Sequence, residues 1–338
     1  MRRSLKIFNR IGFLGLFILV FYTSRVHAEE MIEKRKVETR SYPLSSSDKI
    51  SMSNEYGEMK LTTWDKQEIK IIITIISKAM NEKRADELIK SIMIESSKDA
   101  NGVNCITRFM GNNNLQKNAN KDEEYTINYE VFLPISNPLF VSNKFGLLIV
   151  PDYIGEATIK SEHGTLKTGR ISNAKEVSVE FGRGEIFHIN NGHIIIRYSQ
   201  AEINKLSGDI RATFEFADSI RISMDNDIKT MQIDNLYSKL YLDLAGSFSA
   251  RFKINSQLNG VIIASALKIE EQAGSKKEKD PVNRQYVVTV GSGERKINVE
   301  SKFGKVILGQ YYSYQKKTTT TTTTVEKKKT EKTQKTSN

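Results

Sequence analysis

The stretch from Phe145 to Ile203 decides the fold, because one short pattern occurs in it four times: FGLLIV (145–150), HGTLKT (163–168), FGRGEI (181–186) and YSQAEI (198–203). Each copy opens with a ring and a small residue, and mostly apolar residues stand three and five positions after the ring. Residues two apart on a strand share a face. The pattern therefore predicts a short strand with one buried face in every copy.

Further copies lengthen the array. Phe216 and Tyr237 continue it, with ring-to-ring spacings of 18, 18, 17, 18 and 21 residues from Phe145 onward, and outlying copies at Tyr56 and Phe303 bracket it. A strand and a bend cannot bury an apolar face alone, whereas stacked copies bury it continuously. We therefore expect an all-β chain folded as a parallel β-solenoid, a single-stranded and right-handed β-helix of about 18-residue coils.

The rings and the small residues after them are the candidate structural sites. We expect each ring to pack on the ring of the next coil, with a stacking platform for sugars as the alternative. The small residue is expected to take the bend conformation, which a side chain hinders. The rings are Tyr56, Phe145, His163, Phe181, Tyr198, Phe216, Tyr237 and Phe303, and the bend glycines are Gly57, Gly146, Gly164, Gly182 and Gly304.

The segments around the array have the character of caps. Strand patterns at 67–77, 103–108 and 125–133, with helical spacing over 82–92, predict a β-α-β-β excursion before the array. A second cap is expected over 245–300, and the last unit, at Phe303, is expected to close the fold. The predicted regions are a signal peptide (1–28), a lead-in and β-rich cap with one helix (29–140), the repeats with a closing β cap (141–310), and a disordered Thr/Lys-rich tail (311–338).

Residues 1–28 predict export. Arg2, Arg3, Lys6 and Arg10 precede an apolar run at 11–22, and Val26-His27-Ala28 is a small-x-small cleavage site. The run is shorter than the about 20 residues that span a membrane, and no later segment reaches that length. We expect a mature chain without a transmembrane span, in the periplasm, at the cell surface or secreted; an uncleaved anchor is the alternative.

The net charge of +11 is concentrated at the two ends of the chain. Residues 1–28 hold five basic and no acidic residues, and residues 315–338 hold seven lysines and two glutamates. The nearly neutral body argues against a nucleic-acid binder. A solvated tail is one reading of the lysines, and contact with an anionic surface is the other. The candidate contacts are Lys316, Lys317, Lys327, Lys328 and Lys329.

A single cysteine restricts the chemistry further. Cys105 has no second cysteine to pair with, which excludes an intrachain disulfide and a multi-cysteine zinc site. We expect its thiol to be buried as a small apolar group.

Asn54 to Asp65 (NEYGEMKLTTWD) resembles the opening motif of DUF4097, a family of exported, adhesin-like proteins common in Bacteroidetes-like bacteria. The resemblance continues at Phe132-Leu133-Pro134, at Asn143 to Gly146 and at Lys302 to Val306, and covers roughly residues 45–310. It implies a β-solenoid and little about mechanism. The sequence departs from the family pattern at His163, where a Tyr or Phe is usual, and at Ser199, Ala217 and Ser238, where a glycine is usual.

Catalytic and metal-binding patterns are sparse. Glu180, Glu185, Glu215 and Asp218 are expected to approach one another across coils, but no nucleophile motif accompanies them. His188 and His193 are predicted on opposite faces of a strand, which argues against a metal site. We therefore expect no catalytic residue, cofactor or metal ion.

These observations favour an exported, non-catalytic adhesin-like or scaffold protein of the bacterial cell envelope. Its solenoid faces would bind a surface or a partner, either an envelope component or a protein of unknown identity. A carbohydrate-active enzyme on a β-helix and an envelope-stress or signalling partner remain the alternatives.

Overall fold

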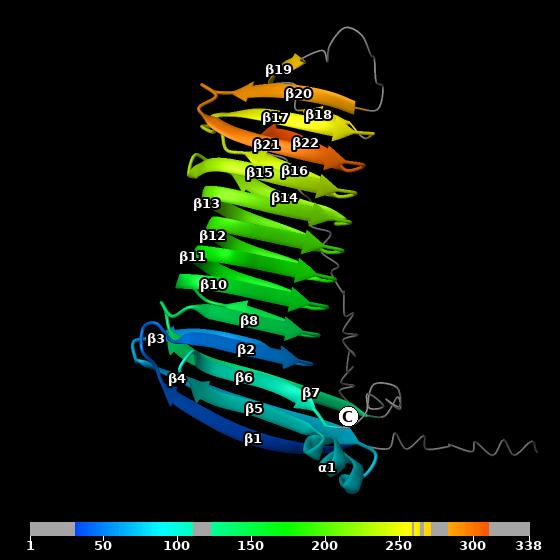
Figure 1. Cartoon of the computed structure of the whole chain (residues 1–338). Helices are drawn as coiled ribbons and strands as arrows, with labels where there is room; N and C mark the ends of the chain where they lie inside the picture. The colour runs from blue at the N-terminus through cyan, green and yellow to red at the C-terminus, as the bar shows by residue number, and fades with distance from the viewer. Residues whose placement is uncertain (1–30, 111–122, 259, 264–266, 272–282, 311–338) are drawn as a thin grey trace, which may run out of the picture.

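The computed structural model describes residues 31–110, 123–258, 260–263, 267–271 and 283–310. The expected signal peptide, the Thr/Lys-rich tail and the five candidate lysines lie outside the described residues. The described chain is all-β, a mostly parallel mixed sheet with one short helix near its N-terminal end (Figure 1). Within the described residues, no helix is long and apolar enough to cross a membrane.

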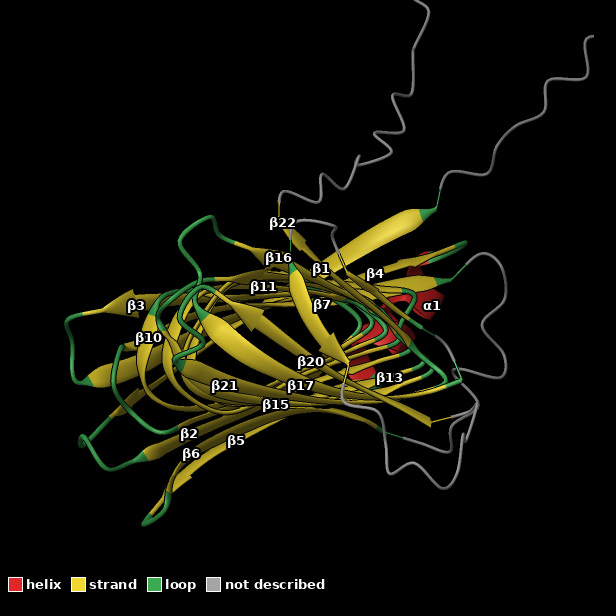
Figure 2. Ribbon diagram, turned by 90° about the horizontal axis from the view of Figure 1, so that it is seen from above, coloured by secondary structure: helices red, strands yellow, loops and turns green. Residues whose placement is uncertain are grey.

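Residues 139–244 fold into stacked turns because their apolar residues recur once per turn. Each turn pairs in parallel with the next, so that Leu166 lies opposite Leu148 on one side and Gly184 on the other. Seen along the stack, the turns lie over one another (Figure 2). The strands are β8 (Leu139–Lys144), β9 (Leu147–Val150), β10 (Tyr153–Glu162), β11 (Thr165–Glu180), β12 (Arg183–Arg197), β13 (Gln200–Glu215), β14 (Ser219–Met224), β15 (Ile228–Leu236) and β16 (Lys239–Leu244).

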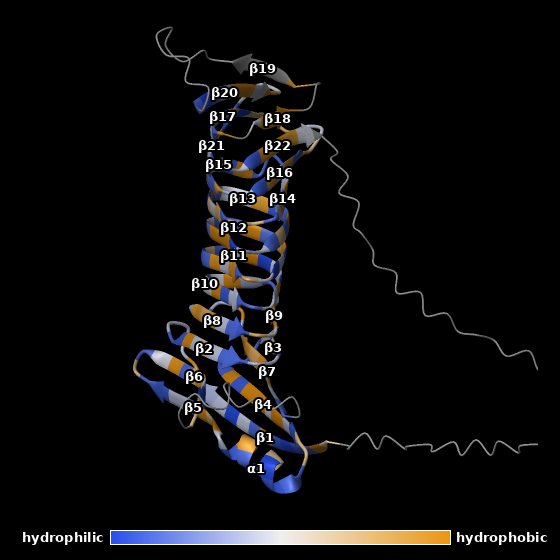
Figure 3. Cartoon of the chain, turned by 90° about the vertical axis from the view of Figure 1, so that its right-hand side faces the viewer, coloured by the Kyte–Doolittle hydropathy of each residue, from blue (hydrophilic) through white to orange (hydrophobic). Residues whose placement is uncertain are grey.

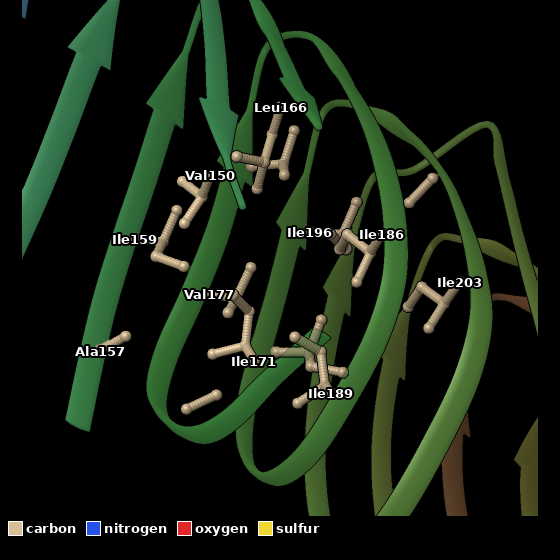
Figure 4. Packing of buried hydrophobic residues seen from close by; sticks show 14 of the residues in the cluster. Val150, Ala157, Ile159, Leu166, Ile171, Val177, Ile186, Ile189, Ile196 and Ile203 are labelled. Atoms are coloured by element: carbon tan, nitrogen blue, oxygen red, sulfur yellow. The ribbon is translucent and has the colours of Figure 1, made fainter. Parts of the chain in front are cut away.

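The core lies inside the turns. Residues three and five positions after the rings, such as Leu166, Ile186 and Ile203, are buried there (Figure 4). Val177 lies in register between Ile159 and Ile194, so β-branched side chains form a column along the stack. Polar residues alternate with these along the strands and face outward (Figure 3). Continuous burial of this kind stabilises each turn only through its neighbours.

The N-terminal end adds turns out of sequence order. One face of the turn formed by β2 and β3 pairs in parallel with β8 and β9, and the other face pairs with β6 and β7. Strand β4 lies antiparallel between β1 and β7, and β5 is antiparallel to β6. The strands are β1 (Ile32–Pro43), β2 (Lys49–Glu55), β3 (Met59–Trp64), β4 (Glu68–Ala79), β5 (Ile92–Asp99), β6 (Gly102–Phe109) and β7 (Glu124–Pro134).

The predicted helix is α1 (Glu82–Lys90), two residues shorter than expected. Its first turn is capped by Asn81, whose Oδ1 accepts a hydrogen bond from the backbone N–H of Arg84 at 2.9 Å. Ala85 and Leu88 form its buried face and pack with Ala79 of β4. Strand β5 follows the helix at once and was not predicted, so the excursion contains one strand more than the sequence analysis expects.

The C-terminal end corrects one prediction. The turn at Phe303 does not close the stack, because β21 and β22 lie between the turn of β15 and β16 and the turn of β17 and β18. Strand β20 then covers β17 in antiparallel orientation, and β19 pairs with β20. The strands are β17 (Ala250–Gln257), β18 (Val261–Ile263), β19 (Lys268–Glu271), β20 (Asn283–Val290), β21 (Arg295–Lys302) and β22 (Lys305–Gln310).

Candidate functional site

The eight ring residues stand at one corner of successive turns, in an unusual backbone conformation. Their φ angles lie between 49° and 63°, the left-handed region. This conformation costs a side-chain-bearing residue roughly 1–2 kcal/mol. Backbone hydrogen bonds to the next turn hold the corner in place: the Phe181 N–H donates to the Arg197 carbonyl at 3.1 Å, and the Tyr198 N–H donates to the Glu215 carbonyl at 3.0 Å.

The glycines after the rings have a different role from the one predicted. The bend conformation belongs to the ring residue, and at positions 164 and 182 glycine is required because the neighbouring turn leaves no room for a side chain. Ser199, Ala217 and Ser238 show that the same position takes a small side chain in other turns. A Cβ on Gly164 would lie 2.0 Å from the Gly146 carbonyl oxygen, and a Cβ on Gly182 would lie 2.0 Å from the Gly164 oxygen. Gly57, Gly146 and Gly304 are crowded in the same way, with nearest atoms at 2.2, 1.9 and 2.4 Å.

Serine stands at this position in two turns, and its hydroxyl bonds backbone groups there. Ser199 is buried, and its Oγ accepts a hydrogen bond from the Gly182 N–H at 2.9 Å and donates to the Arg197 carbonyl at 2.6 Å. Ser238 makes the equivalent pair of bonds, to the Ala217 N–H and the Leu236 carbonyl, both at 2.9 Å. The two departures from glycine are therefore compatible with the same corner.

The rings form a continuous ladder, which we call the aromatic ladder: Tyr56, Phe145, His163, Phe181, Tyr198, Phe216, Tyr237 and Phe303. Neighbouring ring centroids are 4.8–5.1 Å apart and the ring planes are within 15° of parallel. The phenylalanine and tyrosine rings at 145, 181, 198, 216 and 237 remain 41–52 % exposed. Because the faces of the inner rings are covered by their neighbours, only edges meet solvent, and a sugar cannot stack on those faces.

The two ends of the ladder differ. At the N-terminal end Tyr56 meets Phe109 and Tyr125 edge-on, with centroids 5.7 and 5.0 Å away. Burial raises the pKa of Tyr125 well above its usual range, so its hydroxyl stays protonated. At the other end the position after Phe303 belongs to Leu258, because Gln257 and Lys302 lie opposite each other in the two turns.

Leu258 is the ladder residue that the sequence analysis missed. Its φ is 63° and it is 56 % exposed, as for the rings. The signal in the sequence is Gly260 two residues later, together with Val261 and Ile263 three and five positions after Leu258. Only the ring is lacking, and a search that begins from aromatic residues passes over it.

A row of charged side chains runs beside the ladder, one position before each ring except Tyr237, where Leu236 stands. Arg197 lies between Glu180 and Glu215, with N···O distances of 3.4 and 2.8 Å, and Lys144 lies 3.0 Å from Glu162. Glu180 and Glu215 therefore both face a cation, which separates them. The row is a partly exposed ion-pair network.

The other two candidate acids do not join them. Glu185 pairs with Lys167 and Arg183 at 3.2 and 3.1 Å. Burial opposes ionisation, but these two hydrogen bonds outweigh it and keep the pKa of Glu185 below its usual value. Asp218 lies at the corner after Phe216, on the other side of that ring. The four carboxylates are thus dispersed, and a general acid of glycoside hydrolysis needs a raised pKa instead.

The histidines are also separated from one another. His163 is a rung of the ladder, stacked between Phe145 and Phe181 at 4.9 and 4.8 Å. His188 is buried, and its Nδ1 accepts a hydrogen bond from Arg170 Nε at 3.2 Å while Nε2 lies 2.8 Å from the Ser207 hydroxyl.

The pKa of His188 is lowered by burial and then by the nearby Lys205 and Arg170. His193 lies past a corner at Asn191 and Gly192, and its Nε2 is 3.0 Å from the Thr213 hydroxyl. Over the ranges that the structure describes, no three His, Cys, Asp or Glu side chains are grouped so that they could hold a metal ion.

Comparison with known proteins finds only distant structural similarities. No family model matches the chain, and no curated protein matches it. Similar solved structures include a "putative adhesin" from Bacteroides fragilis (10 % identity, TM-score 0.33, 81 % of this chain and 97 % of that one). A second is a "putative cell adhesion protein" from Clostridium sporogenes (10 % identity, TM-score 0.21, 82 % of this chain and 100 % of that one). A third is a "putative adhesin" from Parabacteroides merdae (11 % identity, TM-score 0.22, 81 % of this chain and 96 % of that one). The resemblance to DUF4097 therefore stays a prediction.

Proposed function

We propose that this chain is an exported, non-catalytic β-solenoid protein of the bacterial cell envelope, an adhesin-like protein or scaffold that binds a surface or a partner through its aromatic ladder. One observation carries the proposal: the rings form an unbroken, half-exposed strip. Its seven ring-to-ring steps together span about 34 Å, set by the spacing of paired strands.

The strip has the properties of a binding surface. Aromatic side chains are enriched in the energetically important part of protein interfaces. Stacking and the backbone hydrogen bonds at each corner fix these rings before a partner arrives, so little conformational entropy is lost on binding. The ion-pair row beside the strip supplies a polar rim, as at other interfaces.

The acids support a non-catalytic role. Glu180, Glu185 and Glu215 are each held by a basic side chain. Catalysis of polysaccharide cleavage by paired acids needs one carboxyl that keeps its proton near neutral pH. The lowered pKa of Glu185 is the opposite condition. The envelope-stress or signalling role uses the same surface, and only the identity of the bound partner separates it from adhesion.

The test is binding of the full, exported chain to isolated cell-envelope fractions. The variant is Phe181→Asn with Tyr198→Asn, since asparagine tolerates the left-handed conformation better than most residues. Because interface aromatics typically contribute 1 kcal/mol or more, we expect the double variant to bind roughly tenfold or more weakly. Phe187→Asn is the matched control, because Phe187 is 51 % exposed but stands outside the ladder.

Equal binding by the wild-type chain and a correctly folded double variant would reject the ladder as the binding surface. Equal losses in the double variant and in Phe187→Asn would also reject it, because exposed aromatic residues in general would then be responsible.

A further inference from the structure

The outer face of the C-terminal turns carries positive charges that no acid opposes. We call it the basic face and define it by four outward-facing residues of β17 and β21: Arg251, Lys253, Lys296 and Lys302. The two strands lie side by side and in parallel near the C-terminal end of the stack (Figure 1). All four residues are exposed, so a ligand can reach them.

The middle turns show a different arrangement of charge. There Lys160 lies 2.8 Å from Glu176, and Arg197 lies between two glutamates. On the basic face, by contrast, Arg251 and Lys296 are register partners on neighbouring strands. Like charges directly opposite each other on neighbouring strands destabilise a sheet. The basic face therefore breaks the rule that the middle turns follow.

The other end of the basic face has no opposing acid either. The register partners of Lys302 are Leu236 on one side and Gln257 on the other. Glu294, which precedes β21, pairs with Arg295 at 3.5 Å instead. Within the described residues, no cation of the basic face forms an ion pair. A negatively charged ligand would supply the missing charge.

A hollow of about 370 Å³ adjoins the basic face at Lys302. Ligand sites in proteins commonly measure roughly 300–1,000 Å³. Three strands join their polar side chains across it: Gln285 Nε2 donates to Asn255 Oδ1 at 2.9 Å, and Asn255 Nδ2 donates to Glu300 Oε1. Each amide keeps further hydrogen-bonding capacity, which suits hydroxyl groups. The lining includes Asn255, Gln257, Arg284, Gln285, Glu300 and Lys302.

The shape and polarity of the basic face favour a polymer of sugars. Lys296 and Lys302 stand six residues apart on one strand, which is about 20 Å and longer than a single sugar. No outward-facing residue of β17 or β21 is a large exposed apolar one. Binding to a membrane surface uses such apolar residues beside the cations. Spaced cations with amides at one end fit a chain that carries both negative groups and hydroxyls.

We propose that the basic face binds an acidic polysaccharide. Its carboxylates lie along Arg251, Lys253 and Lys296 and offset the repulsion between the opposed Arg251 and Lys296. One sugar unit enters the hollow beside Lys302, where its hydroxyls bond the amides and Glu300. The basic face does not use the rings of the aromatic ladder, so the inference adds a second binding surface and goes beyond the proposed function.

The test measures binding of oligogalacturonate to the full chain by isothermal titration calorimetry. Its methyl ester is the neutral probe. We expect the acid to bind and the ester to bind at least roughly tenfold more weakly, since several ion pairs are lost together. Lys253→Gln with Lys296→Gln should weaken binding at least roughly fivefold, which equals about 1 kcal/mol. Lys302→Gln should weaken it roughly twofold or more.

Lys160→Gln with Lys175→Gln is the matched control. These lysines pair with Glu176 and Glu156, at 2.8 and 3.4 Å, and their loss changes the net charge equally. The control should bind within about twofold of the wild type. All chains keep the Lys-rich tail, so its attraction for acidic polymers is common to them.

Several outcomes would overturn the proposal. They are no binding of the acid, equal binding of acid and ester, and equal losses in the two double variants. Full binding by Lys302→Gln would reject the sugar unit in the hollow. Anionic vesicles of phosphatidylglycerol are the competing probe. If the chain bound these vesicles but not the oligomer, and Lys253→Gln with Lys296→Gln abolished that binding, the basic face would belong to a membrane.

A charge reversal adds a measurement that needs no ligand. Lys296→Glu places an acid opposite Arg251, so we expect a urea midpoint at or above that of the wild type, together with weaker oligomer binding. A lower midpoint would reject the repulsion between the two cations. The ladder variant Phe181→Asn with Tyr198→Asn should bind the oligomer as tightly as the wild type, so the failure of either proposal is distinguishable from that of the other.

Discussion

Gly182→Ala places a methyl group where the turns approach each other most closely. The new Cβ would lie 2.0 Å from the Gly164 carbonyl oxygen and 3.0 Å from the Gly164 N and C, whereas ordinary contact begins at 3.4 Å. The turns must therefore separate by more than 1 Å at this corner. That separation breaks the hydrogen bond from the Arg183 N–H to the Gly164 oxygen, which is 2.9 Å long.

The expected loss of stability is about 2–4 kcal/mol. Overpacking costs about 1–3 kcal/mol and the broken hydrogen bond about 1 kcal/mol. Since the free energy of unfolding falls by about 1–3 kcal/mol per molar urea, the urea midpoint should fall by roughly 1 M or more. Circular dichroism at the β-sheet band, or the fluorescence of Trp64, follows the transition.

Gly184→Ala is the matched control, two residues further along the chain, in β12. Its Cβ would lie 3.3–3.7 Å from the side chains of Val179, Ala201 and Ile186, all of which can move slightly. We expect a change within about 1 kcal/mol, and a small gain from the restricted unfolded chain is included in that range. Equal midpoints for Gly182→Ala and the wild type would refute the conclusion that space, and not backbone conformation, requires glycine at position 182.

Three other outcomes follow from single residues. Ser199→Ala leaves the partly buried Gly182 N–H without its acceptor and should cost about 1 kcal/mol in urea unfolding; an unchanged midpoint would contradict this. Burial raises the pKa of Cys105 to about 11, so the native thiol should resist an aromatic disulfide reagent at pH 8 and react only in urea; fast native labelling would show that it is accessible. The pKa of His188 in the folded chain is lowered, chiefly by burial, below the about 6.5 of the unfolded chain. The stability that neutral His188 contributes is therefore present above a pH of about 6.5 and is lost as the pH falls through the lowered pKa. The urea midpoint should be lower at pH 5 than at pH 7.5, and this difference should be smaller in His188→Gln. Equal differences in both chains would show that His188 is not the cause.

The features that could be predicted from the sequence are those that depend on residues close together in the chain. The class of the chain, all-β with one short helix, is confirmed, because strand and helix patterns depend on neighbouring residues. The eight ring residues of the ladder could be predicted from the repeat in the sequence, because each turn makes the same ring contacts as the turn before it. The solenoid name and its right-handed sense stay predictions.

The features that escaped prediction depend on contacts between distant segments. The turn at Phe303 comes last in the sequence, and the sequence analysis therefore placed it at the end of the stack. Its position between the turns of Tyr237 and Leu258 follows from pairing between distant strands, which no local pattern predicts. The bend conformation of the rings was misplaced by one residue because glycine is the usual residue with that freedom.

The turns that are inserted out of sequence order at both ends determine when the stack can be completed during synthesis. Residues 295–310 enter between two turns that are made earlier, so the C-terminal end of the stack lacks a layer until these residues have been synthesised. Likewise, the turn of residues 49–64 waits for partners up to residue 150. Long-range pairing of this kind slows folding. A chain that leaves the ribosome with its N-terminus first therefore keeps both ends of the stack incomplete until their late partner strands have been made.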